Sequence, residues 1–332
     1  MQKISFPLLL GLLSLAVIMA FSFSLGVGNS SISVVQALKD YASNTLSLHQ
    51  TVVWDIRLPR VILALLVGAS LGMSGAAMQS FLRNPLADPG ILGVSGGAAL
   101  GAVIVLYFGM AAAAWYWLPG AAIFGAFTAL LLVYLLAGIN ASVLSLILAG
   151  VAINAMAGAL IAVALNFAPS YFALQEIVFW LMGSLANRNI NHVYIAAPFI
   201  LLGWILLLSR TRFLNALSLG EQTAASLGFR PQYERNILLL GLALTVGASV
   251  AVSGSIGFVG LVVPHLLRPL VGYKPGRLLL VSALGGALLV LLADILVRQL
   301  NIARELKLGA VTALIGGPFF LALILKTRSR WM

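Results

Sequence analysis

Few residues in this chain could carry out covalent chemistry. The 332-residue sequence holds 8 acidic residues, 3 histidines and no cysteine. Disulfides and thiolate metal sites are therefore excluded. The histidines, at positions 49, 192 and 265, are scattered without metal-ligand spacing. The G-x-x-x-x-G-K-[ST] phosphate loop and the H-E-x-x-H and G-x-S-x-G patterns are absent. We predict no catalytic, cofactor or metal site, and no ATP site of this kind, on this chain.

One carboxylate could belong to an ion-coupled transport site. Ion-coupled carriers place Asp, Glu or His near the bilayer centre. The main candidate is Asp294, which falls toward a predicted helix end and has Arg298 four residues later. A helical i,i+4 ion pair is the simple interpretation. We therefore favour a passage powered by a separate subunit, with a secondary carrier as the less favoured alternative.

The composition is typical of an integral membrane protein. Hydrophobic residues make up 61% of the chain, charged residues only 8%, and the mean hydropathy is +1.08. A soluble domain has about 45–50% apolar and about 25% charged residues. The formal net charge of +11 would suggest nucleic acid in a soluble protein. Here we attribute it to positively charged cytoplasmic loops, and expect lipid, not nucleic acid, around the chain.

The apolar runs predict an all-α polytopic membrane protein with about ten transmembrane helices. The first run, Ile4 to Leu25, is longer than a signal-peptide core and no cleavage motif follows it, so we expect a retained span. The expected spans cover 5–25, 61–81, 92–109, 119–138, 143–166, 192–209, 235–252, 256–271, 278–297 and 308–326. Lys and Arg are more frequent on the side that holds both termini, which predicts cytoplasmic termini.

The organisation along the chain indicates a single transmembrane domain, 1–332. Two polar segments lie between spans, at 28–60 outside and at about 210–234 inside. The stretch 68–75, GASLGMSG, is similar to 247–254, GASVAVSG, on a span of opposite direction. This similarity suggests an inverted-topology repeat, as in many transporters. Chance is the alternative, because small residues are frequent in membrane helices.

Several stretches together resemble the FecCD-type permease family. They follow the family's order and extend over nearly the whole chain. They are Arg57-Leu-Pro-Arg60 with 67–79 (VGASLGMSGAAMQ), 84–98 (NPLADPGILGVSGGA), 217–228 (LSLGEQTAASLG), 257–268 (GFVGLVVPHLLR), 292–294 (LAD) and 309–318 (GAVTALIGGP).

The resemblance implies the membrane subunit of an ATP-driven type II importer in the bacterial cytoplasmic (inner) membrane. It implies ten helices per subunit and a second permease subunit, with a homodimer favoured over a heterodimer. Two ABC ATPase subunits, which bind ATP and Mg, would dock inside, and a periplasmic substrate-binding protein would dock outside. The expected cargo is a metal chelate, with iron–siderophore ranked before haem and cobalamin.

The inner segment at about 210–234 is implied to be the ATPase-coupling segment. Residues 222–227 can form a short helix, with the acidic Glu221 at its N-terminus, where it suits the helix dipole. Gly228 is placed to end that helix. A capped surface loop is the structural alternative. The resemblance assigns coupling to Leu217, Leu219, Gly220, Glu221, Gln222, Thr223, Ala224 and Leu227.

The resemblance also points to contact and pathway residues. Arg57, Arg60 and Arg298 lie at outer helix ends and match positions that present arginines to acidic residues of the binding protein. Interfacial snorkelling is the alternative. The fifth predicted span is implied to line the pathway. The polar residues of this span have two possible roles. They line the passage or its gate, or they form hydrogen bonds to neighbouring helices. They are Ser142, Ser145, Asn154 and Asn166.

Overall fold

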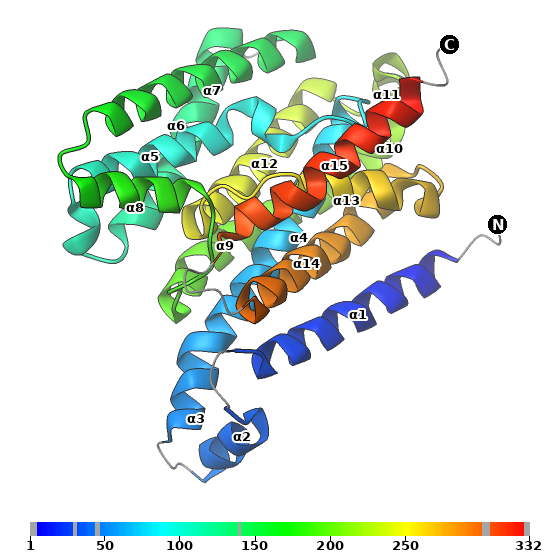
Figure 1. Cartoon of the computed structure of the whole chain (residues 1–332). Helices are drawn as coiled ribbons and strands as arrows, with labels where there is room; N and C mark the ends of the chain where they lie inside the picture. Colours follow the sequence, from blue (N-terminus) through cyan, green and yellow to red (C-terminus); the bar gives the residue numbers. More distant parts are fainter. Residues whose placement is uncertain (1–4, 29–31, 44–46, 139–140, 301–305, 329–332) are drawn as a thin grey trace.

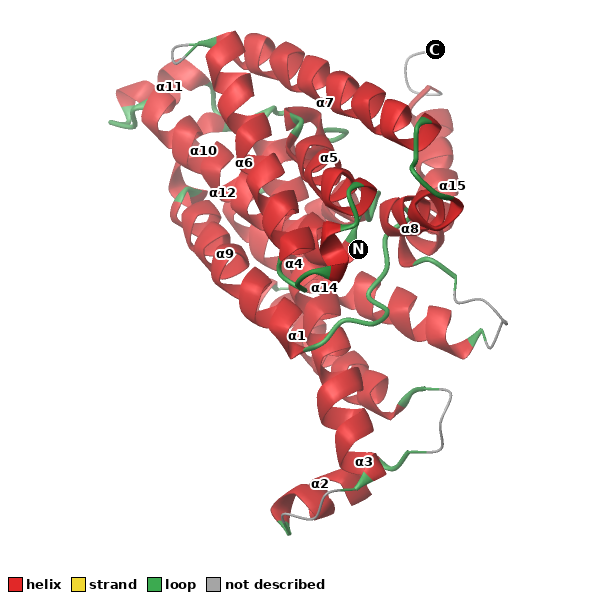
Figure 2. Ribbon diagram, turned by 90° about the vertical axis from the view of Figure 1, so that its left-hand side faces the viewer, coloured by secondary structure: helices red, strands yellow, loops and turns green. Residues whose placement is uncertain are grey.

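The computed structural model describes residues 5–28, 32–43, 47–138, 141–300 and 306–328, and these residues form helices and connections without a strand (Figures 1 and 2). The first half contains α1 (Phe6–Gly26), α2 (Val34–Ala42), α3 (Leu48–Thr51), η1 (Val52–Arg57), α4 (Leu58–Phe81), η2 (Pro89–Leu92), α5 (Val94–Tyr107), η3 (Met110–Ala112), α6 (Trp117–Ala137) and α7 (Val143–Asn166). The second half contains α8 (Tyr171–Leu181), α9 (Ile190–Ser209), α10 (Thr211–Leu217), α11 (Glu221–Ser226), α12 (Pro231–Ser253), α13 (Val259–Leu267), η4 (Arg268–Val271), α14 (Pro275–Gln299) and α15 (Leu308–Arg328).

Each expected span contains a helix at nearly the expected bounds. Seven helices in the described chain are long and apolar enough to cross a bilayer, and they begin at Phe6, Leu48, Trp117, Val143, Ile190, Pro231 and Pro275. The helices of the other three expected spans, α5, α13 and α15, are shorter apolar segments over their described residues. The prediction of an all-α polytopic fold is therefore confirmed.

The core is built around α4, α12 and α14. In the apolar stretch of the α3–α4 helix 89% of the residues are buried, and in that of α12 83% are buried. The corresponding shares are 22% for α1 and 28% for α7. Polar side chains inside the core bond to one another or to the backbone, as in the 2.7 Å contact between the Ser74 and Thr245 hydroxyls and the 2.6 Å bond from the Ser249 hydroxyl to Thr245 O. The peripheral helices leave most of their apolar surface for lipid or for another chain.

Glycines set the close approach of α4 and α14. A Cβ on Gly72 would lie 2.0 Å from the main-chain oxygen of Ser282, and one on Gly68 would lie 2.4 Å from that of Gly286. Backbones at this spacing gain dispersion contacts that larger residues would prevent. Gly68 and Gly72 therefore allow α4 and α14 to pack closely.

Some helices were not expected from the sequence. The connection between the fifth and sixth spans contains α8, and the outer segment 28–60 contains α2 and α3. The helix from Leu48 to Phe81 is continuous over 34 residues, which at about 1.5 Å per residue is longer than the roughly 30 Å hydrocarbon core. In both views α2 and α3 project from the bundle (Figures 1 and 2).

The two ends of the bundle carry different elements. We call the end with α2, the C-terminus of α1 and the C-terminus of α14 the α2 end. The opposite end, with α10, α11 and the N-terminus of α12, is the α11 end (Figures 1 and 2). The repeated stretches 68–75 and 247–254 lie on α4 and α12, which pack together and run in opposite directions.

Candidate functional site

At the α11 end, the expected short helix forms between two glycines. Gly220 precedes α11 with φ +119°, and Gly228 follows it with φ +89°. Glu221 lies in the first turn, where its carboxylate faces the positive end of the helix dipole. The expected helix, its acidic start and its glycine end are therefore confirmed.

The residues expected to couple divide into two groups. Leu217 and Ala224 are buried and hold α11 against its neighbours, whereas Leu219 and Leu227 are large apolar side chains that are 70% and 61% exposed. Among the other residues expected to couple, Glu221, Gln222 and Thr223 are also exposed. An apolar and acidic surface at the tip of a short helix can contact another protein.

The first turns of α12 are tied to three neighbouring elements. Arg210 at the end of α9 pairs with Glu234 at 2.6 Å. The Tyr134 hydroxyl, from α6, donates to the Asn236 side chain at 3.0 Å. Arg235 Nη1 donates to the main-chain oxygen of Ala141 at 2.6 Å, immediately before α7. A displacement of α11 and the start of α12 can thus reach α7.

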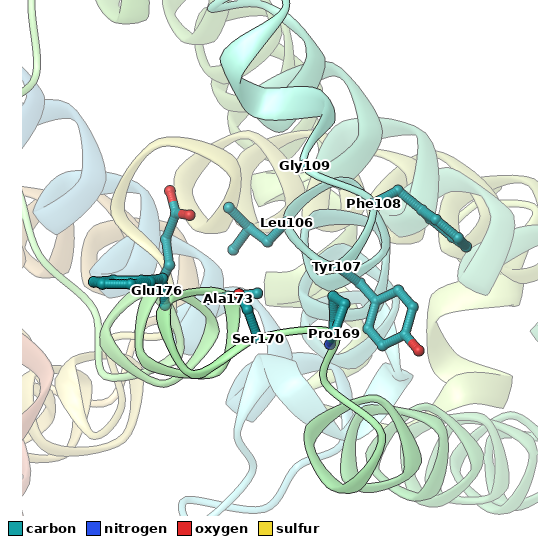
Figure 3. A pocket seen from close by; sticks show the side chains of 9 residues that line it. Leu106, Tyr107, Phe108, Gly109, Pro169, Ser170, Ala173 and Glu176 are labelled. Atoms are coloured by element: carbon teal, nitrogen blue, oxygen red, sulfur yellow. Dashed lines mark hydrogen bonds between the residues drawn. The ribbon is translucent and has the colours of Figure 1, made fainter.

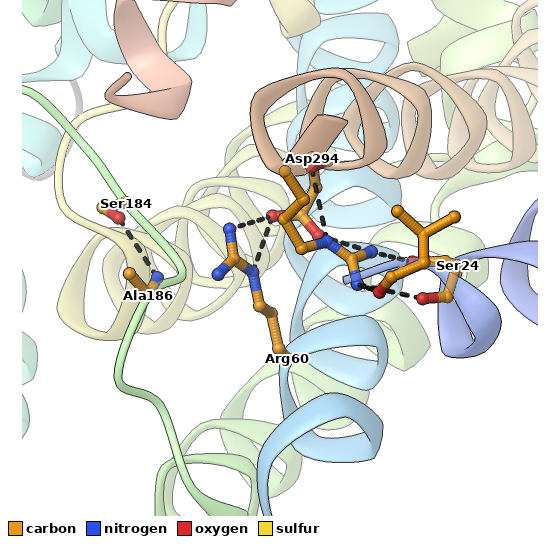
Figure 4. Close-up of polar contacts among 7 residues, drawn as sticks. Ser24, Arg60, Ser184, Ala186 and Asp294 are labelled. Atoms are coloured by element: carbon orange, nitrogen blue, oxygen red, sulfur yellow. Dashed lines mark hydrogen bonds and ion pairs between the residues drawn. The ribbon is translucent and has the colours of Figure 1, made fainter. Parts of the chain in front are cut away.

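At the α2 end, the three expected docking arginines come together, but their guanidinium groups bind within the chain. Arg60 Nη2 lies 2.8 Å from Asp294 Oδ1, and Arg298 Nη2 lies 3.0 Å from Asp294 Oδ2. Figure 4 shows Arg60 directed at Asp294, with Ser24 on the other side of this carboxylate. The expected i,i+4 pair of Asp294 and Arg298 is confirmed, and Arg60 is a further partner.

The same arginines hold the C-terminus of α1. Arg298 Nη1 donates to the main-chain oxygens of Ser24 and Val27 at 2.9 and 2.8 Å. Arg57 Nη1 donates to those of Leu25 and Gly26 at 2.9 and 3.1 Å. These oxygens lie at a helix C-terminus, where positive charge is stabilising. The cluster therefore joins α1, α4 and α14.

The polar residues of α7 have different surroundings. The Ser142 hydroxyl caps the helix by accepting from Ser145 N at 3.1 Å, and the two hydroxyls lie 3.0 Å apart. Asn166 donates to Ala162 O of its own helix at 2.8 Å. Asn154 lies against α5, where a Cβ on Gly96 would be 2.2 Å from its Oδ1. Of the four residues, only Asn154 lines a cavity that also touches the end of α8.

Two cavities follow each other along α8. The first, of about 630 Å³, lies between the end of α5 and the start of α8, and Figure 3 shows the Glu176 side chain at its edge. The second, of about 500 Å³, is bordered by Leu181 at the other end of α8 and by Asp88, Ser95, Asn154 and Ser255. Burial raises the pKa of the Asp88 carboxyl, and the bond from Gly90 N, at 2.7 Å, opposes the rise.

Close backbone contacts fix the C-terminal end of α8. Gly183 has φ +72°, and a Cβ there would lie 2.3 Å from Ser255 O. Ser184 N donates to Ser253 O at 2.7 Å, and Gly309 N donates to Gly183 O at 3.3 Å. The ends of α8 and α12 thus meet the start of α15. Irregular backbone at membrane depth is tolerated where protein satisfies it or where it borders a cavity.

Sequence reasoning missed Glu176 and Asp88 as candidate site residues. Each is a single carboxylate in a largely apolar stretch, and a rare charge within a membrane protein was the available signal. Their shared position along α8 was not visible, because no helix was expected there.

Apolar spanning helices, cavities beside them and the exposed short helix α11 define a multi-pass membrane transport protein. The model of the FecCD transport family matches residues 15–326. The chain belongs to the FecCD transport family.

Similar proteins are of comparable length. The hemin transport system permease protein HmuU of Yersinia pestis is 41% identical over 328 residues, covering 97% of each chain. The vitamin B12 import system permease protein BtuC of Salmonella arizonae is 41% identical over 317 residues, covering 95% of this chain and 93% of the relative. The iron(3+)-hydroxamate import system permease protein FhuG of Bacillus subtilis is 35% identical over 321 residues, covering 94% and 95%.

A solved structure has the same fold. It is an inward-facing conformation of a metal-chelate type ABC transporter, 37% identical in sequence with a TM-score of 0.83. The match covers 97% of this chain and 100% of the other.

Proposed function

We propose that this chain is the permease subunit of an ATP-driven importer that moves a metal chelate from the periplasm to the cytoplasm. The observation that carries the proposal is the family match, which extends from residue 15 to residue 326. In this proposal residues 1–332 form a single permease domain in the bacterial inner membrane. The permease carries out no covalent chemistry, and ATP and Mg bind to the partner ATPase subunits.

The α11 end is the proposed ATPase contact. Its support is the exposed apolar pair of Leu219 and Leu227 on a rigid helix that is held between glycines. We propose that α11 is pushed by the ATPase and carries the start of α12 with it. The α11 end would then be cytoplasmic, in agreement with the positive-inside expectation.

The α2 end is the proposed dock for the substrate-binding protein. Three arginines gather there: Arg60 and Arg298 share the carboxylate of Asp294, and Arg57 binds the end of α1. Guanidinium groups at this end of the bundle would attract carboxylates of a docking protein. The bonds within the cluster make its arginines structural residues as well, and a docking test must separate the two roles.

The proposed path runs beside α7 and α8, between this chain and a second permease subunit. Support comes from α7, which is largely exposed although it spans the bundle, and which carries Asn154 at its centre. A polar side chain on an exposed face of a spanning helix favours contact with protein or water over lipid. Ser142 and Ser145 would lie at the inner gate of this path, and Asn166 near its outer end.

The proposed cargo is an iron–siderophore chelate, with haem or cobalamin as the alternative. The named relatives divide among hemin, iron(3+)-hydroxamate and vitamin B12 systems at similar identity. Overall similarity therefore does not select one of these cargoes.

Reconstitution tests the proposal. The permease is placed in liposomes with its ATPase partner and with the binding protein on the outer face, and uptake of labelled ferric hydroxamate, haem and cobalamin is measured. We expect uptake of one of them that requires ATP and both partners. Uptake driven by an ion gradient without the ATPase would instead support a secondary carrier and overturn the proposal.

A further inference from the structure

The charged side chains that line the two cavities along α8 are both carboxylates, whereas Lys307 Nζ lies over the Phe179 ring of α8, outside both linings. The cavity at the start of α8 is lined by Leu106, Tyr107, Phe108, Gly109, Pro169, Ser170, Phe172, Ala173 and Glu176. Glu176 is the only charged residue in this set. In the second cavity, among the described residues, the only charged side chain is that of Asp88. Each cavity thus has one carboxylate, and no Lys or Arg of the described chain lines either one.

The Glu176 carboxylate is available to a ligand. It is exposed, and the described residues provide no ion pair or hydrogen bond to it. Phe172 precedes it by four residues and therefore lies on the same face of α8. Phe172 is 80% exposed. An aromatic face beside a carboxylate attracts cations, particularly organic ammonium groups.

The position of this first cavity is fixed by the fold. The Tyr107 hydroxyl donates to Phe167 O at 2.8 Å, which ties the end of α5 to the end of α7. The Ser170 hydroxyl accepts from Ala173 N at 3.1 Å and caps α8. Glu176 is therefore presented from a capped helix that follows a segment tied to α5, and not from a loose loop.

The second carboxylate continues the same track. Asp88 Oδ1 accepts from Gly90 N, which fixes its orientation, and Ser95, Asn154 and Ser255 add neutral polar groups to the cavity. A chelate that moves along α8 would meet Glu176 first and Asp88 next. A negatively charged chelate would be repelled at both positions.

We propose that the two cavities along α8 form an acidic track, in which Glu176 and Asp88 favour chelates with a cationic, ammonium-bearing face over neutral and anionic ones. The inference rests on the proposed importer function and adds a class of cargo to it. A ligand that needs only hydrogen-bond acceptors would use the same carboxylates, so the test must vary charge alone.

Three probes with the same iron centre vary the charge: a ferric trihydroxamate with a free amine (ferrioxamine B), its N-acetylated form and its N-succinylated form. ATP-dependent uptake of each is measured in proteoliposomes with one binding protein throughout. Because the binding protein is constant, a change in the uptake ratio between wild type and variant belongs to the permease. We expect Glu176→Gln to reduce the amine-to-acetyl ratio by about two- to tenfold.

Two further variants make the result decisive. Glu176→Asp keeps the charge and should retain the preference, whereas Asp88→Asn keeps an oxygen for Gly90 N and should reduce it. Gln175→Ala, next to Glu176 but outside the cavity lining, serves as the control and should leave the ratio unchanged. Equal ratios in wild type and Glu176→Gln would overturn the acidic track. Absence of ATP-dependent uptake of any tested chelate by the wild type, haem and cobalamin included, would instead contradict the importer function.

Discussion

Arg235 Nη1 and the main-chain oxygen of Ala141 lie 2.6 Å apart, and this bond joins the first turn of α12 to the residue before the Ser142 cap of α7. The Arg235 side chain is buried. The packing contacts of α7 are chiefly with α5, α6 and η2. The bond is therefore a direct polar connection between α12, which continues the proposed coupling segment, and the start of the proposed pathway helix.

The first prediction concerns this connection. Arg235→Ala removes a charge-assisted bond whose net value is about 1.5–3 kcal/mol, so motion of α12 should reach α7 less well. In proteoliposomes, we expect Arg235→Ala to raise the number of ATP molecules hydrolysed per chelate transported. Arg235→Lys should give a ratio between those of Arg235→Ala and wild type. Tyr134→Phe removes the neighbouring bond from α6 to Asn236 without affecting α7. If both variants change the ratio equally, Arg235 has no special role in transmission.

The second prediction concerns the start of α11. Gly220 has φ +119° and its N–H donates to Leu217 O at 3.0 Å. Proline would fix φ near about −65° and remove this donor. Gly220→Pro should therefore displace α11 and separate ATP hydrolysis from uptake while the spanning helices stay folded. Helical circular dichroism and uptake measure the two effects, with Gly120→Ala, in open space at ordinary φ, as the control. Normal transport by Gly220→Pro would contradict the coupling role.

The third prediction concerns docking. Arg57→Glu reverses one charge of the arginine cluster, so affinity for the binding protein should fall, and the loss should be greatest at low ionic strength. Surface plasmon resonance at several salt concentrations measures this affinity. Arg57→Gln keeps a neutral donor for the oxygens of Leu25 and Gly26 and should lose less. An affinity that does not depend on the charge at this position would remove Arg57 from the dock.

The fourth prediction separates structure from docking in the same cluster. Asp294→Asn removes the carboxylate that Arg60 and Arg298 share. Removing one member of a buried ion pair costs about 3–5 kcal/mol, so the apparent Tm in detergent should fall clearly. In Asp294→Asn combined with Arg60→Gln, the loss should be smaller than the sum of the two single losses, because each single variant breaks the same ion pair. Additive losses in the double variant would mean that the two groups do not interact.

The fifth prediction concerns the crossing of α4 and α14. A Cβ on Gly72 would meet Ser282 O at 2.0 Å, too close for two backbones to remain in place. Gly72→Ala should therefore reduce the apparent Tm and the yield of folded protein. Gly11→Ala, on the peripheral α1 with open space around it, should change neither. Equal stability of the two variants would contradict the proposed close packing.

Much of the fold was predictable because lipid requires long apolar helices, and the hydropathy runs record them directly. The α11 helix was predictable for a different reason, since Glu221 and Gly228 are local signals at its two ends. The α8 helix was not predicted. It has 11 residues, too few to cross the bilayer, and its end is held by contacts with distant segments at Ser253 and Gly309.

The sequence by itself determined the membrane class, the positions of the spanning helices and the absence of familiar catalytic motifs, because these depend on composition and local pattern. Tertiary structure decided which rare polar groups meet. It turned Arg60 and Arg298 toward one buried carboxylate, and it placed Glu176 and Asp88 in successive cavities along α8. The physical reason is that electrostatic and hydrogen-bonded contacts act over a few ångströms in space, and they join residues far apart in the sequence, such as Arg60 and Asp294, which are 234 positions apart.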